Sequence, residues 1–232
     1  HDALDANTTA NYNTAIGNDC LSSNSTGAQN TAVGASSGSS ITTGNYNVAM
    51  GVDTLSTLST GSNNTALGKG ASAATTTASD NVSVGYLALA ANTTGTNNVA
   101  MGANALDANT TASNNTAIGD NALGVNVDGS SNTALGSAAL AAMVDANYST
   151  AIGADTLQNA TGGANTACGQ AALNGVVAGI YNTGLGYNAG SAVTSGDNNL
   201  CLGRDAGIAS SPGGAVTTGD NQICLGDENI TH

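Results

Sequence analysis

The sequence predicts an all-β protein, a parallel β-roll or β-helix solenoid of 17-residue coils, and three observations predict it. The five-residue word Asn-Thr-Ala-Ile-Gly at 13–17 returns in variants with a 17-residue period along most of the chain. A fixed repeat of this length is typical of a stacked array in which each coil rests on the previous one. Two apolar stations recur at the same places in each repeat. Gly, Asn, Ser and Thr dominate the remaining positions, which disfavours helix and suits the corners of β coils.

The glycine that ends the word marks the period of the array. The step from Gly153 to Gly169 is shorter than the others by one position, and the step from Gly203 to Gly226 is longer. We therefore predict tandem coils over 1–203, and an insertion-bearing last coil with a terminal connector over 204–232. The glycines of the series are Gly17, Gly34, Gly51, Gly68, Gly85, Gly102, Gly119, Gly136, Gly153, Gly169, Gly186, Gly203 and Gly226.

The two apolar stations predict where the strands of a coil lie. The first is a small residue followed by leucine, three and four places after the glycine, as in Ala105-Leu106 and Ala122-Leu123. The second is the word itself. Because Thr, Val and Ile favour strands, we expect two short strands and two turns in each coil. Coils of this kind stack as parallel strands about 4.8 Å apart.

Side-chain alternation within the word predicts apolar atoms on both faces of the strand. Thr150 and Ile152 point one way, and Ala151 points the other. A coil has only one interior, so identical chains around a symmetry axis are expected to cover the second apolar face. The near-invariant alanine suits close approach of a sister chain there; the alternative is that it simply tolerates solvent. The asparagine that opens the word is expected to form an amide ladder along the stack.

Composition limits the partners of the chain. The net charge is −13, and Lys69 and Arg204 are the only Lys or Arg residues. Such a chain repels nucleic acid and anionic membrane surfaces. No stretch reaches the roughly 18 apolar residues of a transmembrane helix, so we expect no membrane insertion in this fragment. The 232 residues contain no Trp and no Phe, which predicts a core of thin aliphatic layers.

The word resembles the head repeats of YadA-like trimeric autotransporter adhesins. The full unit, as in 119–136, is similar to the related repeats of phage tail fibres and other trimeric fibre proteins. The resemblance covers about residues 3–203 with an outlying copy at 222–226. It implies a left-handed parallel β-roll, an intertwined homotrimer and a role in attachment outside the cell. The implied partners are a surface receptor, such as a glycan or an outer-membrane component, and other fibre or baseplate segments.

Three functions follow as hypotheses. The first is a structural and adhesive segment of a virion fibre, such as a phage or phage-like tail fibre. The second is the head of a bacterial surface adhesin. A C-terminal membrane β-barrel elsewhere in the protein would indicate an autotransporter, whereas a baseplate-binding N-terminus or a self-cleaving chaperone end would indicate a virion fibre. The third, from a different class, is an ice- or calcium-dependent binder.

The third hypothesis depends on two sets of repeat positions. Asp128 and Asp145 occupy the same repeat position, so they are expected to stack one coil apart, where calcium could bridge them. Thr93-Thr94 and Thr110-Thr111 are expected to be neighbours in consecutive coils, and a regular threonine array can bind ice. The array is interrupted further along the chain, at 127–128, 144–145 and 177–178.

We predict no enzymatic activity, no catalytic residue and no cofactor or metal site. Histidine occurs only at His1 and His232, so a histidine-based triad or metal cluster is not expected in the body of the chain. No Gly-rich phosphate loop with its lysine is present. The Gly213-Gly214 pair is assigned to a turn.

The cysteines and the last step of the array each leave two interpretations open. Cys201 and Cys224 occupy the same repeat position and are expected about 5 Å apart, near disulfide range. We favour free, buried thiols for all four cysteines, Cys20, Cys168, Cys201 and Cys224. The insertion in 204–226 carries the only proline, Pro212. It is interpreted as a bulging loop or cap, and the alternative is a receptor-contacting or domain-joining feature.

Overall fold

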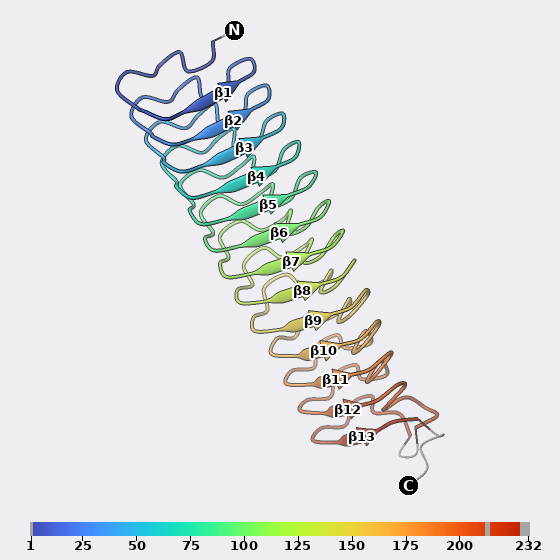
Figure 1. Cartoon of the computed structure of the whole chain (residues 1–232). Coiled ribbons are helices and arrows are strands. Elements are labelled where there is room, and N and C mark those ends of the chain that lie inside the picture. Colours follow the sequence, from blue (N-terminus) through green and yellow to red (C-terminus); the bar gives the residue numbers. More distant parts are fainter. Residues whose placement is uncertain (1, 212–213, 228–232) are drawn as a thin grey trace. The chain divides into compact units, whose positions relative to one another are not determined.

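A computed structural model describes residues 2–211 and 214–227, which contain thirteen three-residue strands and no helix. The chain divides into two compact units, 1–115 and 116–232. Coils follow one another along each unit, with one strand per coil (Figure 1). The first unit contains β1 (Thr14–Ile16), β2 (Thr31–Val33), β3 (Val48–Met50), β4 (Thr65–Leu67), β5 (Val82–Val84) and β6 (Val99–Met101). The second contains β7 (Thr116–Ile118), β8 (Thr133–Leu135), β9 (Thr150–Ile152), β10 (Thr166–Cys168), β11 (Thr183–Leu185), β12 (Leu200–Leu202) and β13 (Ile223–Leu225).

Within each unit every strand pairs in parallel with the next strand of the sequence. Thr14 lies opposite Thr31, its equivalent one repeat later, and the same step recurs through most pairs. Thr150 pairs with Thr166 across the short step, and Leu200 pairs with Ile223 across the long one. The predicted all-β parallel solenoid with 17-residue coils is therefore confirmed.

The alanine of the word faces the interior of the coil. Ala32, Ala66 and Ala117 are completely buried, while the residues on either side of each are partly exposed. This confirms that neighbouring side chains of the word point to opposite faces. The expectation that alanine forms the outer face, against a sister chain, is wrong. The buried leucine of the first station occupies the interior, which leaves room for little more than a methyl group on the inward side of the strand.

The first station is a turn, so each coil holds one strand where two were expected. Leu106 and Leu123 are fully buried, and their φ angles of +51° and +50° lie in the left-handed region, which no strand can contain. Such a conformation costs a non-glycine residue about 1–2 kcal/mol. Complete burial of a leucine side chain contributes about 1.5–3 kcal/mol, which offsets that strain.

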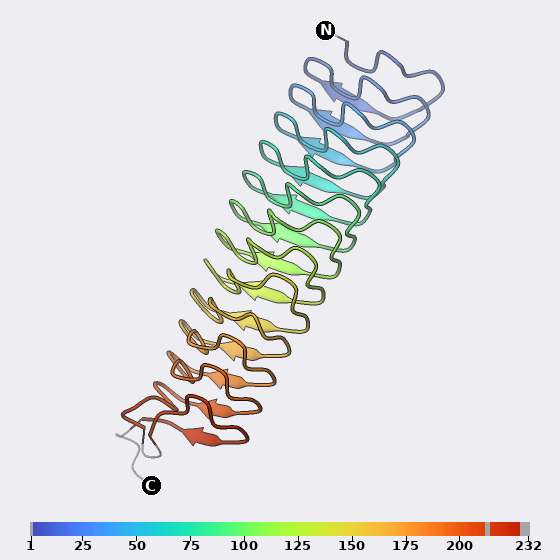
Figure 2. The same cartoon turned by 180° about the vertical axis from the view of Figure 1, so that it is seen from behind.

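Hydrogen bonds between coils continue through these turns. The Leu89 N–H donates to the Ala105 carbonyl at 2.9 Å, and the Leu123 N–H donates to the Ala139 carbonyl at 3.0 Å. The turn segments close each coil and are visible when the molecule is seen from behind (Figure 2). Each coil is thus tied to its neighbour along the strand and along the turns.

Candidate functional site

The predicted asparagine ladder forms and is buried. Asn47 donates from its backbone N–H to Asn30 Oδ1 at 2.9 Å, and from Nδ2 to the Gly61 carbonyl at 2.9 Å. Asn64 repeats the first contact with Asn47 Oδ1 at 3.0 Å. Asparagine is replaced by Ser149 and Gln222 in two words of the series. Their N–H groups still donate to Asn132 Oδ1 and Asn199 Oδ1, each at 2.9 Å. The amides of the ladder hold neighbouring coils together, so the ladder is structural.

The outward positions of the strands form an uncharged stripe, which we call the strand stripe. Its last column is apolar in every strand, and its members include Ile16 at 61% exposure, Met50 at 44% and Leu135 at 43%. The first column of the strands carries Thr, Val, Leu or Ile. Neither column contains a carboxylate or an amine, although the net charge of the chain is −13. The last column consists of Ile16, Val33, Met50, Leu67, Val84, Met101, Ile118, Leu135, Ile152, Cys168, Leu185, Leu202 and Leu225.

Threonine forms a column on the first unit. The hydroxyls of the neighbouring repeat position bind the next coil: Thr42 Oγ1 donates to the Ser59 carbonyl at 3.1 Å, and Thr76 Oγ1 donates to the Thr93 carbonyl at 3.1 Å. The exposed column beside them is one residue wide. Its members are Thr9, Thr26, Thr43, Thr60, Thr77, Thr94 and Thr111.

The structure offers no metal centre in its described part. Asp128 and Asp145 occupy the repeat position of the exposed threonine column in the second unit, and both are exposed. Within 2–211 and 214–227, no group of three or more His, Cys, Asp or Glu side chains is placed to hold a metal ion. His1, His232 and Gly213 lie outside the described residues.

The four cysteines are free, but they are not all buried as expected. Cys20 and Cys201 are buried, Cys224 is half-buried and Cys168 is exposed in the strand stripe. Cys201 and Cys224 lie opposite each other in β12 and β13, which confirms their shared repeat position. Burial raises the pKa of the Cys20 thiol. Burial, together with the neighbouring Cys224, raises the pKa of Cys201 to about 12.

We predict that Cys201 resists alkylation in the folded protein. The thiolate is the reactive form, and a pKa of about 12 leaves about one thiolate in ten thousand thiols at pH 8. Iodoacetamide treatment followed by peptide mass mapping measures the rate at each cysteine. Cys201 should react at least about a hundredfold more slowly in buffer than in denaturant, where its pKa returns to about 8.5. Equal rates in the two conditions would contradict the buried placement.

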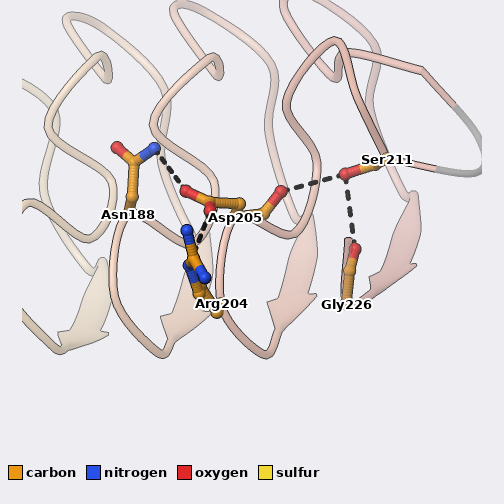
Figure 3. A network of polar contacts seen from close by, with 5 residues as sticks. All are labelled: Asn188, Arg204, Asp205, Ser211 and Gly226. Atoms are coloured by element: carbon orange, nitrogen blue, oxygen red, sulfur yellow. Dashed lines mark hydrogen bonds and ion pairs between the residues drawn. The ribbon is translucent and has the colours of Figure 1, made fainter. Parts of the chain in front are cut away.

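The beginning of the long last step is held by a polar network (Figure 3). Asp205 accepts from Asn188 Nδ2 at 2.8 Å and pairs with Arg204 Nε at 3.0 Å. Ser211 Oγ lies 3.0 Å from the Asp205 carbonyl and 3.4 Å from the Gly226 carbonyl. The hydroxyl therefore joins the start of the insertion to the glycine of the last word. Pro212, which marks the insertion in the sequence, lies outside the described residues.

A hollow that was not predicted from the sequence lies in the second unit. It has a volume of about 280 Å³ and is lined by Ala146, Asn147, Tyr148, Gly163, Ala164, Ile180 and Tyr181. The sequence signal that could have found it is the short step of the array, which places Gly162-Gly163 between two coils that carry tyrosine.

The fold and these surfaces define the chain as a parallel β-solenoid repeat protein whose strands carry an uncharged, largely apolar outer face. Comparisons with protein-family models, with curated proteins and with solved structures find no match. No helix in the described part of the chain has the length and apolarity needed to cross a bilayer.

Proposed function

We propose that this chain is a structural and adhesive segment of a trimeric extracellular fibre, of the phage or phage-like tail-fibre kind. The observation that carries the proposal is the strand stripe, which repeats without a charged side chain from β1 to β13. Copies with a net charge of −13 repel one another, so an uncharged surface is where close contact costs least. Identical chains lying side by side would cover the stripe along its length.

The coils also have the mechanical properties that a fibre needs. Each coil is joined to the next by strand pairing, by the buried asparagine ladder and by hydroxyl-to-carbonyl bonds such as that from Thr93 Oγ1 to the Thr110 carbonyl at 3.0 Å. Contacts in such an array are made mainly between neighbours, so length can be added without changing the fold.

The head of a bacterial trimeric adhesin is the alternative, because the same stripe and the same coils would serve it equally. An ice-dependent binder is less well supported. The exposed threonine column is one residue wide, and aspartate replaces it at Asp128 and Asp145. A calcium-dependent binder has no group of three or more carboxylates within the described residues to support it.

We expect the chain to sediment at three times its mass of 22.1 kDa. Leu135→Asp, in the middle of the stripe, should shift the protein to a monomer, because a charge buried between chains costs several kcal/mol. Analytical ultracentrifugation measures both. The matched control is Ser195→Asp, which adds the same charge at the repeat position where Asp128 and Asp145 already stand, and it should stay trimeric.

Cys168 supplies a native reporter for the same assembly. Its side chain is exposed in the single chain and belongs to the stripe. Alkylation should be slow in the trimer and fast in the Leu135→Asp monomer. A wild-type protein that sediments as a monomer and reacts rapidly at Cys168 would refute the proposed assembly.

A further inference from the structure

The hollow of the second unit lies at the one short coil of the array. Within the step from Gly153 to Gly169, the corner before β10 has one residue fewer than the others. The backbone there is pressed against its neighbours: a Cβ atom on Gly163 would lie 2.6 Å from the Asn147 carbonyl oxygen, and one on Gly162 would lie 2.5 Å from the Ala178 carbonyl oxygen. Neither glycine can therefore be replaced by a larger residue without a clash, so the corner itself contributes no side chain to the hollow.

Two tyrosines stand on either side of this corner. The strand register places Tyr148, Ala164 and Tyr181 at one repeat position in three consecutive coils. Tyr148 is 73% exposed and Tyr181 is 62% exposed. Parallel strands about 4.8 Å apart put the two tyrosine backbones about 10 Å apart. A single ring in van der Waals contact with both tyrosine faces needs about 7–8 Å, since each contact is about 3.5–4.0 Å.

The first unit contains the same arrangement with a larger residue in the middle coil. Tyr12 and Tyr46 also stand two coils apart at this repeat position, and Gln29 lies between them. The φ angles agree closely, at +59° for Gln29 and +57° for Ala164. The backbone conformation therefore matches at this one position, and what distinguishes the hollow is the small Ala164 side chain together with the missing residue in the corner before it.

The polar groups of the hollow suit hydroxyl groups rather than charge. Asn147 Oδ1 accepts from the Ser130 N–H at 2.6 Å, while Asn147 Nδ2 makes no hydrogen bond within the described residues. This leaves one amide donor at the edge of a largely apolar hollow. No Asp, Glu, Lys, Arg or His residue lines it. In a chain with a net charge of −13 this disfavours an anionic ligand, such as an acidic sugar or a nucleotide, by repulsion.

We propose that the hollow binds the ring of a neutral saccharide between Tyr148 and Tyr181, with Asn147 donating to a ring hydroxyl. A pyranose has apolar C–H faces that stack on tyrosine and hydroxyl edges that accept from an amide. The assignment rests on the proposed attachment function, because it supplies the surface glycan to which such a fibre would attach. The hollow lies at the corner that precedes the strands, so covering the strand stripe in a trimer does not require filling it.

The test is saturation-transfer NMR on the full chain, with methyl glucoside, methyl galactoside and N-acetylglucosamine as neutral probes. Sialic acid is the anionic probe, and para-cresol is the aromatic one. At least one neutral sugar should bind in about the millimolar range, and sialic acid should not. Tyr148→Ala should weaken binding about tenfold, as expected for the loss of one stacking contact.

Ala164→Gln is the more discriminating variant, because it places a glutamine between the two tyrosines, as Gln29 stands between Tyr12 and Tyr46 in the register of the first unit. It should abolish sugar binding and leave the circular dichroism spectrum unchanged. Tyr12→Ala is the matched control and should bind as the unmodified chain does. Binding that survives Ala164→Gln would overturn the site, and binding of para-cresol without any sugar would overturn the ligand class.

The sedimentation experiment separates this inference from the proposed function. A trimer that binds no neutral sugar would refute the site and leave the fibre assembly standing. A monomer that binds sugar and loses it in Ala164→Gln would support the site and refute the assembly.

Discussion

Replacing Gly34 with alanine is expected to destabilise the first unit by about 2–5 kcal/mol. The φ angle of Gly34 is +132°, and a Cβ atom there would lie 2.4 Å from the Gly51 carbonyl oxygen of the next coil. The strained backbone angle contributes about 1–2 kcal/mol. Forcing the two backbones apart contributes about 1–3 kcal/mol more.

The neighbouring coils have little freedom to relieve this clash. The Gly34 N–H donates to the Ile16 carbonyl at 2.8 Å, and the Gly51 N–H donates to the Val33 carbonyl at 2.8 Å. Moving either glycine therefore breaks the pairing of a strand. Since coils are stabilised by their neighbours, we expect a lower melting temperature and a loss of β signal before the main transition. Circular dichroism during a thermal melt measures both effects.

Gly214→Ala is the control for the backbone angle alone. Gly214 also has a positive φ, of +80°, but a Cβ atom there would meet nothing within 4 Å. Its expected cost is about 1–2 kcal/mol, from strain without a clash. Similar shifts in the two variants would show that close stacking at the glycine series does not limit stability.

The repeat made the stacking of the strands predictable. A constant period requires equivalent residues in consecutive coils to be neighbours, so the pairing of Thr14 with Thr31 follows from the spacing. The asparagine ladder follows for the same reason, because one polar residue at every corner can bind only its own kind or the backbone. The short step was also visible in the sequence, but its consequence at Ala164 depends on the side chains of two other coils.

Two features could not be predicted, for physical reasons. Alternation assigns Thr116 and Ala117 to opposite faces without showing which face is inside. Which face lies inside depends on side-chain volume, because the interior also holds the side chains of Leu106 and Leu123 from the turns. The left-handed conformation of those leucines opposes their local preference. It occurs because burial and hydrogen bonds between coils outweigh the strain, and both depend on the assembled stack.

Replacing Asn47 with alanine is expected to cost about 2–6 kcal/mol. Asn47 Oδ1 accepts from the Asn64 N–H at 3.0 Å and from Asn64 Nδ2 at 3.1 Å. Asn47 Nδ2 donates to the Gly61 carbonyl at 2.9 Å. Truncation leaves a buried N–H and a buried carbonyl without these partners, and each unsatisfied group costs about 1–3 kcal/mol.

Thermal and urea unfolding followed by circular dichroism would measure this loss, with Asn18→Ala as the matched control. Asn18 is exposed, and within the described part of the chain its Nδ2 donates only to the adjacent Asp19 side chain. The control should change stability by less than about 0.5 kcal/mol, as surface substitutions usually do. If Asn47→Ala were equally mild, water would have to replace the amide inside the ladder, and the ladder would then not be what holds the coils in register. A large loss of stability in Asn47→Ala, beside a small one in Asn18→Ala, would show that buried amides hold the stack together. A solenoid needs such bonds because its three-residue strands provide few hydrogen bonds between coils.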